Sequence, residues 1–212
     1  MISLQDTWTD YLQYGKRIFY KKNTVVFQQG DLRNGFYYIL KGIIKITSND
    51  PGKGKRILDI AGPGYLIGDT DCKPYFSSAV CHNDSVLYYY SKQDYERLLD
   101  EHPETSSIFF RSLIQKQRLL LSNLNVTSAD TEHQMAHSLL HLSNIYKGRE
   151  IDLTQQEVSQ YVGLTRYTVY NIVKKWSAEG IITVQNRKIA ILDVEKLKEK
   201  LLGSSKKYFA NK

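Results

Sequence analysis

Short apolar runs separated by turn residues fill the first half of the chain, from about residue 21 to residue 90. In stretches such as FYYILKG and IIKITSND the runs are only a few residues long and rich in β-branched and aromatic side chains, which is typical of strands. Gly, Pro, Asn and Asp recur between them, as at residues 49–52 and 62–64. The pattern predicts an antiparallel barrel or jelly roll, flanked by short helices at residues 3–15 and 91–103.

A long helical pattern follows at residues 104–127, where apolar side chains recur three and four positions apart. These are heptad core positions, and one polar residue among them, Gln117, is compatible with a two-stranded coiled coil. The pattern favours a homodimer, and packing of the helix on its own barrel is the alternative. The predicted dimer contacts are Phe110, Leu113, Gln117, Leu120 and Leu124.

Two short helices joined by a tight turn are predicted further along the chain. Thr154 and Glu157 form a Thr-x-x-Glu capping box at the first helix start, and Gly163 permits the positive φ of a turn. Apolar residues then repeat at helical spacing up to Trp176, so this is a helix-turn-helix pattern, with an αα-hairpin inside a helical domain as the alternative. The polar side of the second helix mixes hydrogen-bond donors with aromatic rings and suits a DNA major groove: Arg166, Tyr167, Tyr170, Asn171 and Lys174.

The surrounding segments complete a winged-helix domain. Capping residues at Thr127, Ser128 and Asp130 precede a further amphipathic helix, and we place the domain boundary there. After Gly180, the apolar strands 181–185 and 188–192 are separated by only two residues, which predicts a β-hairpin wing. The whole chain is therefore expected to be α+β, with a barrel domain at residues 1–103, a linking dimerisation helix at 104–127 and a winged helix-turn-helix domain at 128–212.

Composition and charge narrow the functional class. The 212 residues are 42% hydrophobic and 24% charged, without a long apolar run or a signal-peptide pattern, which indicates a cytoplasmic protein with no membrane partner. Residues 1–106 hold 13 basic and 13 acidic side chains, whereas residues 107–212 hold 16 and 9 and carry the whole net charge of +7. Positive charge beside a helix-turn-helix favours double-stranded DNA as the partner, against a merely solvated basic face.

The chain offers little for metal or enzyme chemistry. Cys72 and Cys81 are the only cysteines, too few for a zinc or iron-sulfur site, and two buried thiols are favoured over a redox disulfide. The glycine-rich stretch 62–68 lacks the Lys-Ser/Thr of a phosphate-binding loop, and no nucleophile-base constellation is present. We therefore expect neither a metal, nor an identifiable cofactor, nor an enzyme.

These stretches, in this order, resemble the Crp/Fnr superfamily of bacterial transcription regulators over nearly the whole chain. The resemblance rests on VVFQQGD, FYYILKGIIKI, GPGYLIGD, the linking helix, MAHSLLHL and, above all, LTQQEVSQYVGLTRYTVYNIVKKWSAEGII with its hairpin. It implies a double-stranded β-helix that senses a small effector, a dimerising central helix, and a winged helix that binds a palindromic operator and acts on RNA polymerase.

The resemblance also assigns roles on the recognition helix. Arg166 matches an arginine that reads guanine, but Tyr167 replaces a glutamate that accepts from cytosine, and Asn171 replaces a second arginine. The usual half-site of the family is therefore not expected. Residues near helix starts and in the wing suit contacts to phosphates, and they are Thr154, Gln155, Thr165, Thr168, Arg187 and Lys188.

The expected effector site departs further from the family pattern. Gly68 and Asp69 match the glycine-acid pair of members that bind cyclic AMP, but Ser77 and Ser78 replace the arginine-serine pair, so no cation falls at the phosphate position. A buried phosphate without a counter-charge costs several kcal/mol, so we expect weak or no response to cyclic AMP. Leu119 and Leu120 replace polar residues of the linking helix, and Tyr75 is expected to face a cavity. An aromatic or other hydrophobic effector, such as the phenolic acids sensed by halorespiration regulators of the family, fits these residues.

The sequence leaves two alternatives to control by an effector. The first is a regulator that is independent of any effector or is controlled by thiol redox chemistry at Cys72 and Cys81. The second alternative is a ligand-binding module that acts through protein partners, for which DNA binding would show no steep dependence on salt.

Overall fold

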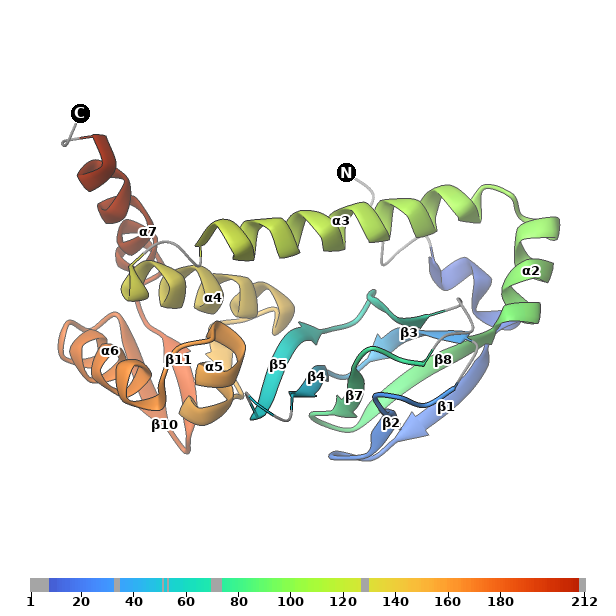
Figure 1. Ribbon diagram of the computed structural model, residues 1–212, viewed down its shortest axis with the longest axis horizontal. Coiled ribbons are helices and arrows are strands. Elements are labelled where there is room, and N and C mark those ends of the chain that lie inside the picture. Colours follow the sequence, from blue (N-terminus) through green and yellow to red (C-terminus); the bar gives the residue numbers. More distant parts are fainter. Residues whose placement is uncertain are drawn as a thin grey trace. The chain divides into compact units, whose positions relative to one another are not determined.

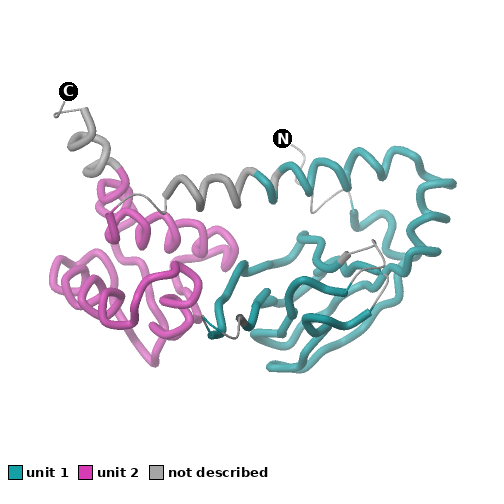
Figure 2. Tube along the Cα trace, viewed as in Figure 1, with its two compact units in different colours: residues 1–119 teal, residues 120–212 magenta. Residues whose placement is uncertain are grey.

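The chain forms two compact units, residues 1–119 and residues 120–212, coloured separately in Figure 2. The computed structural model describes residues 8–32, 35–50, 52, 54–69, 74–126 and 130–209. Both units combine helices with antiparallel strands, so the predicted α+β class is confirmed. The division between the units falls inside the long helix α3 (Thr105–Val126). The bounds of α3 lie close to those predicted for the linking helix, residues 104–127.

Two antiparallel sheets make up the β-structure of the N-terminal unit in the part of the chain that the structure describes (Figure 1). Closing two sheets on each other limits the exposure of strand edges, as the predicted jelly roll requires. The strand order of the first sheet is β1 (Lys16–Tyr20), β8 (Ser85–Ser91), β3 (Gly35–Lys41) and β6 (Leu66–Asp69), and that of the second is β2 (Val25–Phe27), β7 (Ser78–Cys81), β4 (Ile44–Asp50) and β5 (Gly54–Ala61).

Strand β3 contributes to two separate hydrophobic cores. Because successive side chains of a strand point to opposite faces, Tyr37 and Ile39 pack into the core that contains residues of both sheets, while Phe36 and Tyr38 pack into the other. All four are buried. The first sheet is therefore covered on both faces.

Helical segments cover the outer face of this sheet. The second core gathers residues of the 3-10 helix η1 (Thr9–Tyr14), of α2 (Lys92–Glu101) and of the first turns of α3. The ring of Phe109 in α3 lies 5.5 Å from that of Phe36 and 5.2 Å from that of Tyr95. These aromatic contacts attach the start of the linking helix to the sheet.

The C-terminal unit packs four helices with a small antiparallel sheet of strand order β10-β11-β9, counted over the described residues. Asp130 caps the first helix by accepting from His133 N at 2.8 Å, while the predicted caps Thr127 and Ser128 lie outside the described residues. The elements are α4 (Thr131–Ile145), β9 (Glu150–Ile151), α5 (Gln155–Val162), α6 (Arg166–Ala178), β10 (Ile182–Gln185), β11 (Lys188–Ile191) and α7 (Val194–Phe209).

The predicted helix-turn-helix is formed by α5 and α6. Thr154 and Glu157 make the capping box in both directions, with bonds of 3.2 and 2.9 Å. Gly163 ends α5 with a φ of 82°, a left-handed conformation that a β-carbon would strain, and Thr165 caps α6 by accepting from Thr168 N. Sequence-local capping thus fixes both helix boundaries at the turn.

The wing is a tight hairpin between β10 and β11. Gln185 pairs with Lys188, so the turn consists only of Asn186 and Arg187, with φ values of 49° and 65°. Two left-handed residues make a type I′ turn, whose second position favours glycine. Arg187 occupies this position at an energetic cost.

The strain at Arg187 gives a stability prediction. Replacing Arg187 by Gly removes the left-handed penalty, and we expect the free energy of unfolding of the C-terminal unit to rise by about 1 kcal/mol. Lys188→Gly is the matched control, because glycine in the strand lowers that free energy by roughly 0.5–1 kcal/mol. Urea unfolding of both variants measures the difference, and a less stable Arg187→Gly protein would contradict the assignment of the turn.

Candidate DNA-binding surface and sensor site

The recognition helix α6 has one buried and one exposed face. Val169, Ile172, Val173 and Trp176 are buried in the C-terminal unit. The side chains predicted to read bases all lie on the exposed face, where Tyr167 is 74% and Tyr170 51% exposed. The other three exposed residues of this face are Arg166, Asn171 and Lys174.

The residues expected to contact phosphates lie at the starts of the two helices and at the wing. Thr165 Oγ1 accepts from Thr168 N at 3.1 Å and lies 2.8 Å from Thr168 Oγ1, so both hydroxyls help to close the first turn of α6. Thr154 caps α5, and Gln155 is its first residue. A capped helix start still directs backbone N–H groups outward, where they can donate to a phosphate oxygen.

The cations of the C-terminal unit differ in how they are paired. Arg166 and Lys174 of α6 make no ion pair with any residue of the described ranges, and neither does Arg187 at the wing tip. In contrast, Lys175 pairs with Glu132, and Lys188 Nζ lies 3.6 Å from Asp152 Oδ1. The exposed face of α6 therefore presents unneutralised positive charge, which favours phosphate binding.

Helix α3 carries exposed apolar side chains at heptad spacing. Phe110 is 65%, Leu113 48% and Ile114 47% exposed, and Gln117 follows on the same face. The side chains of Leu120 and Leu124, which continue the predicted dimer seam, lie outside the described part of the helix. Several large apolar groups exposed together on one helix face are suited to a second helix.

In the N-terminal unit, Gly68 lies where the strands β3 and β6 approach closely. Its φ is 100°, and a β-carbon there would lie 3.0 Å from Gly35 O and 3.1 Å from Phe36 Cα. Ser77 and Ser78 are half-buried, and Ser78 Oγ accepts from Gln29 N at 2.9 Å. The side chains of Asp69, Leu119 and Leu120 lie outside the described residues.

Tyr75, which the sequence predicts to face a cavity, is buried in the core of the N-terminal unit. Its ring is 3% exposed and stacks on Phe27 at 4.2 Å in the core between the sheets. Its hydroxyl donates to Gly35 O at 2.9 Å, so the polar end of the side chain is satisfied inside the protein. The neighbouring Phe76 is 82% exposed. Tyr88, Tyr89 and Tyr90 of strand β8 pack on the two cores.

An acidic side chain that the sequence did not single out lies on β5 near the linking helix. Burial raises the pKa of Asp59, while the positive charge of Lys116 in α3 and the bond from Ile60 N lower it, and the net pKa stays above the ordinary value. Burial also raises the pKa of Tyr65, and the charge of Asp59 adds to this shift. The N–H of Ile60 donates to Asp59 at 2.8 Å. Burial therefore favours the neutral form of this carboxyl group.

The thiol of Cys81 is buried and free. Burial raises its pKa to about 11, more than the bond with Ser85 lowers it, so the thiolate is scarce at neutral pH. Since the thiolate is the reactive form, Cys81 is poorly suited to redox sensing. Cys72 lies outside the described residues.

No three His, Cys, Asp or Glu side chains gather within the described ranges in an arrangement that would hold a metal ion. None of the helices within those ranges has the length and apolarity to cross a membrane.

Sequence reasoning missed a polar cluster behind the recognition helix. Glu132 was not singled out in the sequence, but it contacts Lys175 and Trp176 of α6 and Lys200 of α7. Its partners are 43 residues or more away along the chain, so no local pattern reveals them.

Comparison with known proteins agrees with this geometry. The cyclic nucleotide-binding domain family matches residues 17–102, and the Crp-like helix-turn-helix domain family matches residues 133–200. A CRP-like cAMP-activated global transcriptional regulator of Mycobacterium tuberculosis is 26% identical over 189 residues, covering 84% of each chain.

Solved structures show the same fold. A CRP/FNR family transcriptional regulator of Thermus thermophilus superposes with a TM-score of 0.77 at 22% identity, covering 89% of this chain and 100% of the other. CprK in complex with OCPA gives a TM-score of 0.67 at 16% identity, covering 91% and 92%. These relatives are transcription regulators and not enzymes. With a cyclic nucleotide-binding domain followed by a Crp-like helix-turn-helix, the chain belongs to the Crp/Fnr superfamily of bacterial transcription regulators.

Proposed function

We propose that the protein is a cytoplasmic homodimer that binds palindromic operators in double-stranded DNA through α6, under the control of a small effector other than cyclic AMP. One observation carries the DNA part: the buried face of α6 fixes which side chains point outward, and these are cations, an amide and two exposed tyrosines. A major groove accommodates a helix with such a face.

Base reading is assigned to the first turns of α6. Arg166 makes no ion pair with the described residues, and its guanidinium group can donate to O6 and N7 of guanine, a contact that contributes about 1–3 kcal/mol of discrimination. Tyr167 has no carboxylate to accept from cytosine, and its exposed ring is suited to the methyl group of thymine. Asn171 can bond an adenine edge. The half-site therefore differs from one read by an arginine, a glutamate and a second arginine.

Dimerisation is assigned to the exposed seam of α3. Phe110, Leu113 and Ile114 lose contact with water when a second α3 packs on them. Two copies related by a twofold axis would present two α6 helices, and these bind one operator when they lie roughly 34 Å apart, one turn of DNA. An effector that changes the pairing of the α3 helices shifts this spacing and hence the affinity. The bound dimer then contacts RNA polymerase.

The effector is proposed to lack a phosphate. Ser77 and Ser78 supply no positive charge to balance a phosphate. An uncharged molecule avoids this cost. A hydrophobic effector remains in keeping with Leu119 and Leu120.

The alternatives have less support. Control by thiol redox chemistry is disfavoured by the raised pKa of Cys81, and the exposed cations of α6 favour DNA over a protein partner. An effector-independent regulator differs from the main proposal only in the absence of a response to any ligand.

The base-reading assignment is tested by Arg166→Ala and Lys188→Ala. We expect Arg166→Ala to lower the affinity for the preferred operator about tenfold and to abolish the preference at one base pair, because it removes a contact to a base. Lys188→Ala should weaken specific and nonspecific DNA alike, with a smaller change in the salt slope than the loss of an unpaired cation gives, because Lys188 lies 3.6 Å from Asp152. Selection from a randomised duplex library followed by fluorescence anisotropy measures both, and an unchanged base preference of Arg166→Ala contradicts the assignment.

The effector assignment is tested with cyclic AMP. Titration up to millimolar concentration should leave the affinity for the selected operator unchanged, because no cation neutralises the phosphate. The cAMP-activated relative from Mycobacterium tuberculosis, with its own operator, is the positive control for the assay. Tightening of operator binding at micromolar cyclic AMP would refute the assignment.

A further inference from the structure

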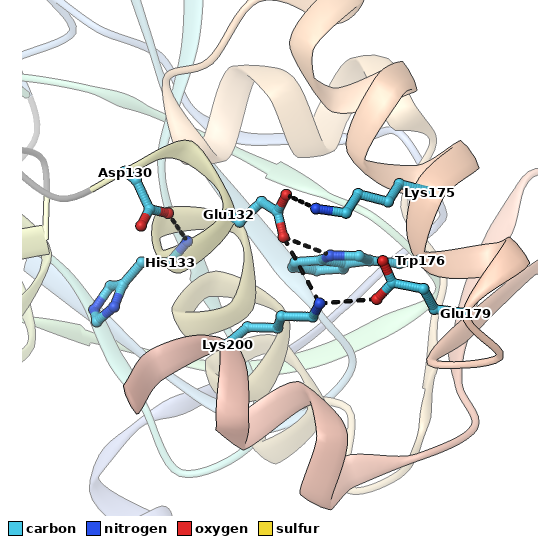
Figure 3. A network of polar contacts seen from close by, with 7 residues as sticks. All are labelled: Asp130, Glu132, His133, Lys175, Trp176, Glu179 and Lys200. Atoms are coloured by element: carbon cyan, nitrogen blue, oxygen red, sulfur yellow. Dashed lines mark hydrogen bonds and ion pairs between the residues drawn. The ribbon is translucent and has the colours of Figure 1, made fainter. Parts of the chain in front are cut away.

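The back of the recognition helix is attached to two neighbouring helices by a polar cluster centred on Glu132 (Figure 3). One carboxylate oxygen of Glu132 accepts from Lys175 Nζ, and the other accepts from Trp176 Nε1 at 3.1 Å. Lys200 Nζ of α7 lies 3.9 Å from that second oxygen and donates to Glu179 Oε2 at 2.8 Å. We call these five residues the Glu132 cluster.

The cluster joins three helices around a buried indole. Glu132 lies in the first turn of α4, Lys175 and Trp176 lie in the last turns of α6, and Lys200 lies in α7. Trp176 is 0% exposed, so its N–H must find an acceptor inside the protein, and Glu132 supplies it. A charged acceptor makes this hydrogen bond stronger than a neutral one.

The cluster holds the end of α6 that is opposite to the base-reading end. Arg166 and Trp176 are ten residues apart, which in a helix is about 15 Å. If the C-terminal end is the fixed point, a tilt of about 10° displaces the side chains near Arg166 by roughly 2.6 Å. A bidentate hydrogen bond to a guanine does not survive such a displacement.

The adjacent residues Lys174 and Lys175 allow a positioning role to be distinguished from direct DNA binding. Both are exposed, but Lys174 belongs to the face with Arg166 and Tyr170 and makes no ion pair within the described residues, whereas Lys175 is bonded to Glu132. A cation held by a carboxylate is already neutralised and contributes little to counterion release. The two residues therefore make a matched pair for mutation.

We propose that Glu132 is a positioning residue for operator binding: it fixes the angle of α6 by holding Lys175 and Trp176 against α4, and Lys200 closes the cluster from α7. The proposal rests on the proposed function, because it presupposes that α6 enters the major groove. Glu132 also follows the linking helix by only six residues along the chain.

The charge of Glu132 gives a pH prediction for stability. Burial raises its pKa, but the bonds from Lys175 and Trp176 and the charge of Lys200 lower it more, so the net pKa lies below the ordinary value of 4.5. The cluster also contains the carboxylate of Glu179, and the other titratable groups near it are Asp130 and His133.

A depressed carboxyl pKa stabilises the folded state above the unfolded pKa, and this contribution is lost as the pH falls through the folded value. Glu132→Gln lacks the contribution. The difference in midpoint temperature between wild type and Glu132→Gln should therefore be constant near neutral pH and shrink below about pH 4.5. A difference that grows on acidification would contradict the charged state of the cluster.

The positioning role is tested with the full chain and a duplex that the wild-type protein selects from a randomised library. The variants are Glu132→Gln, Lys175→Met and the double variant, with Lys174→Met as the matched lysine control. Glu195→Gln is the carboxylate control, because Glu195 pairs only with Lys198 on the surface of α7 within the described residues. Fluorescence anisotropy over a range of salt concentrations gives both the affinity and the slope of log K against log salt.

We expect Glu132→Gln and Lys175→Met each to lower the affinity about tenfold with an unchanged salt slope. The double variant should resemble the single ones, because all three variants lose the same contact between Glu132 and Lys175. Lys174→Met should reduce the slope by about one. The chain has two tryptophans, so two indole N–H resonances are expected, and only that of Trp176 should shift in Glu132→Gln while Glu195→Gln leaves both in place.

Wild-type affinity of Glu132→Gln and Lys175→Met, a reduced salt slope in either, or additive effects in the double variant would overturn the positioning role. If Lys174→Met and Arg166→Ala weaken binding while Glu132→Gln does not, only the positioning role fails. If neither Lys174→Met nor Arg166→Ala affects binding, the proposed DNA surface is wrong, and the positioning role fails with it.

Discussion

The structure depends on the burial of one face of α6 in the C-terminal unit. Val169, Ile172, Val173 and Trp176 must avoid water, and the helical repeat then leaves no choice about which residues face outward. Each of these large apolar groups contributes about 1.5–3 kcal/mol on burial, far more than an exposed polar side chain gains from pointing one way. The orientation of the candidate DNA-binding face is thus a consequence of the core.

Burial of apolar side chains also fixes the start of the linking helix in the N-terminal unit. Strand β3 is apolar on both faces, so one set of rings fills the barrel and the other receives the start of α3 through Phe109. Aromatic rings packed edge to face and stacked, as Phe36 is against Trp8 and Tyr90, form a rigid support. The linking helix is therefore firmly attached to the sheet from which a sensor signal would come, while its exposed seam of Phe110, Leu113 and Ile114 is left for a partner.

The features that the sequence predicted well are local. The capping box at Thr154, the left-handed Gly163 and the two-residue wing turn each depend on residues a few positions apart, and all three are present in the structure. The exposed face of α6 followed from periodicity in the same way. That these residues contact DNA is a separate claim, which rests on their chemistry and on the family.

The features that it predicted poorly depend on contacts between distant segments. The ring of Tyr75 stacks on Phe27 and its hydroxyl donates to Gly35 O, 40 residues away along the chain. Asp59 of β5 and Glu132 of α4 each interact with a lysine of a helix that is distant along the chain, which no spacing rule reveals. The partners of buried polar side chains depend on the tertiary structure. The effector site could therefore be predicted from the sequence only in outline.

The most direct test of the central claim is dimethyl sulfate footprinting of the selected operator with the wild-type protein, since the reagent methylates guanine N7 in the major groove and adenine N3 in the minor groove. The account predicts protection of guanine N7 in two half-sites whose centres are about 10 base pairs apart. Full reactivity of every guanine N7 in the bound complex, with protection confined to adenine N3, would contradict it.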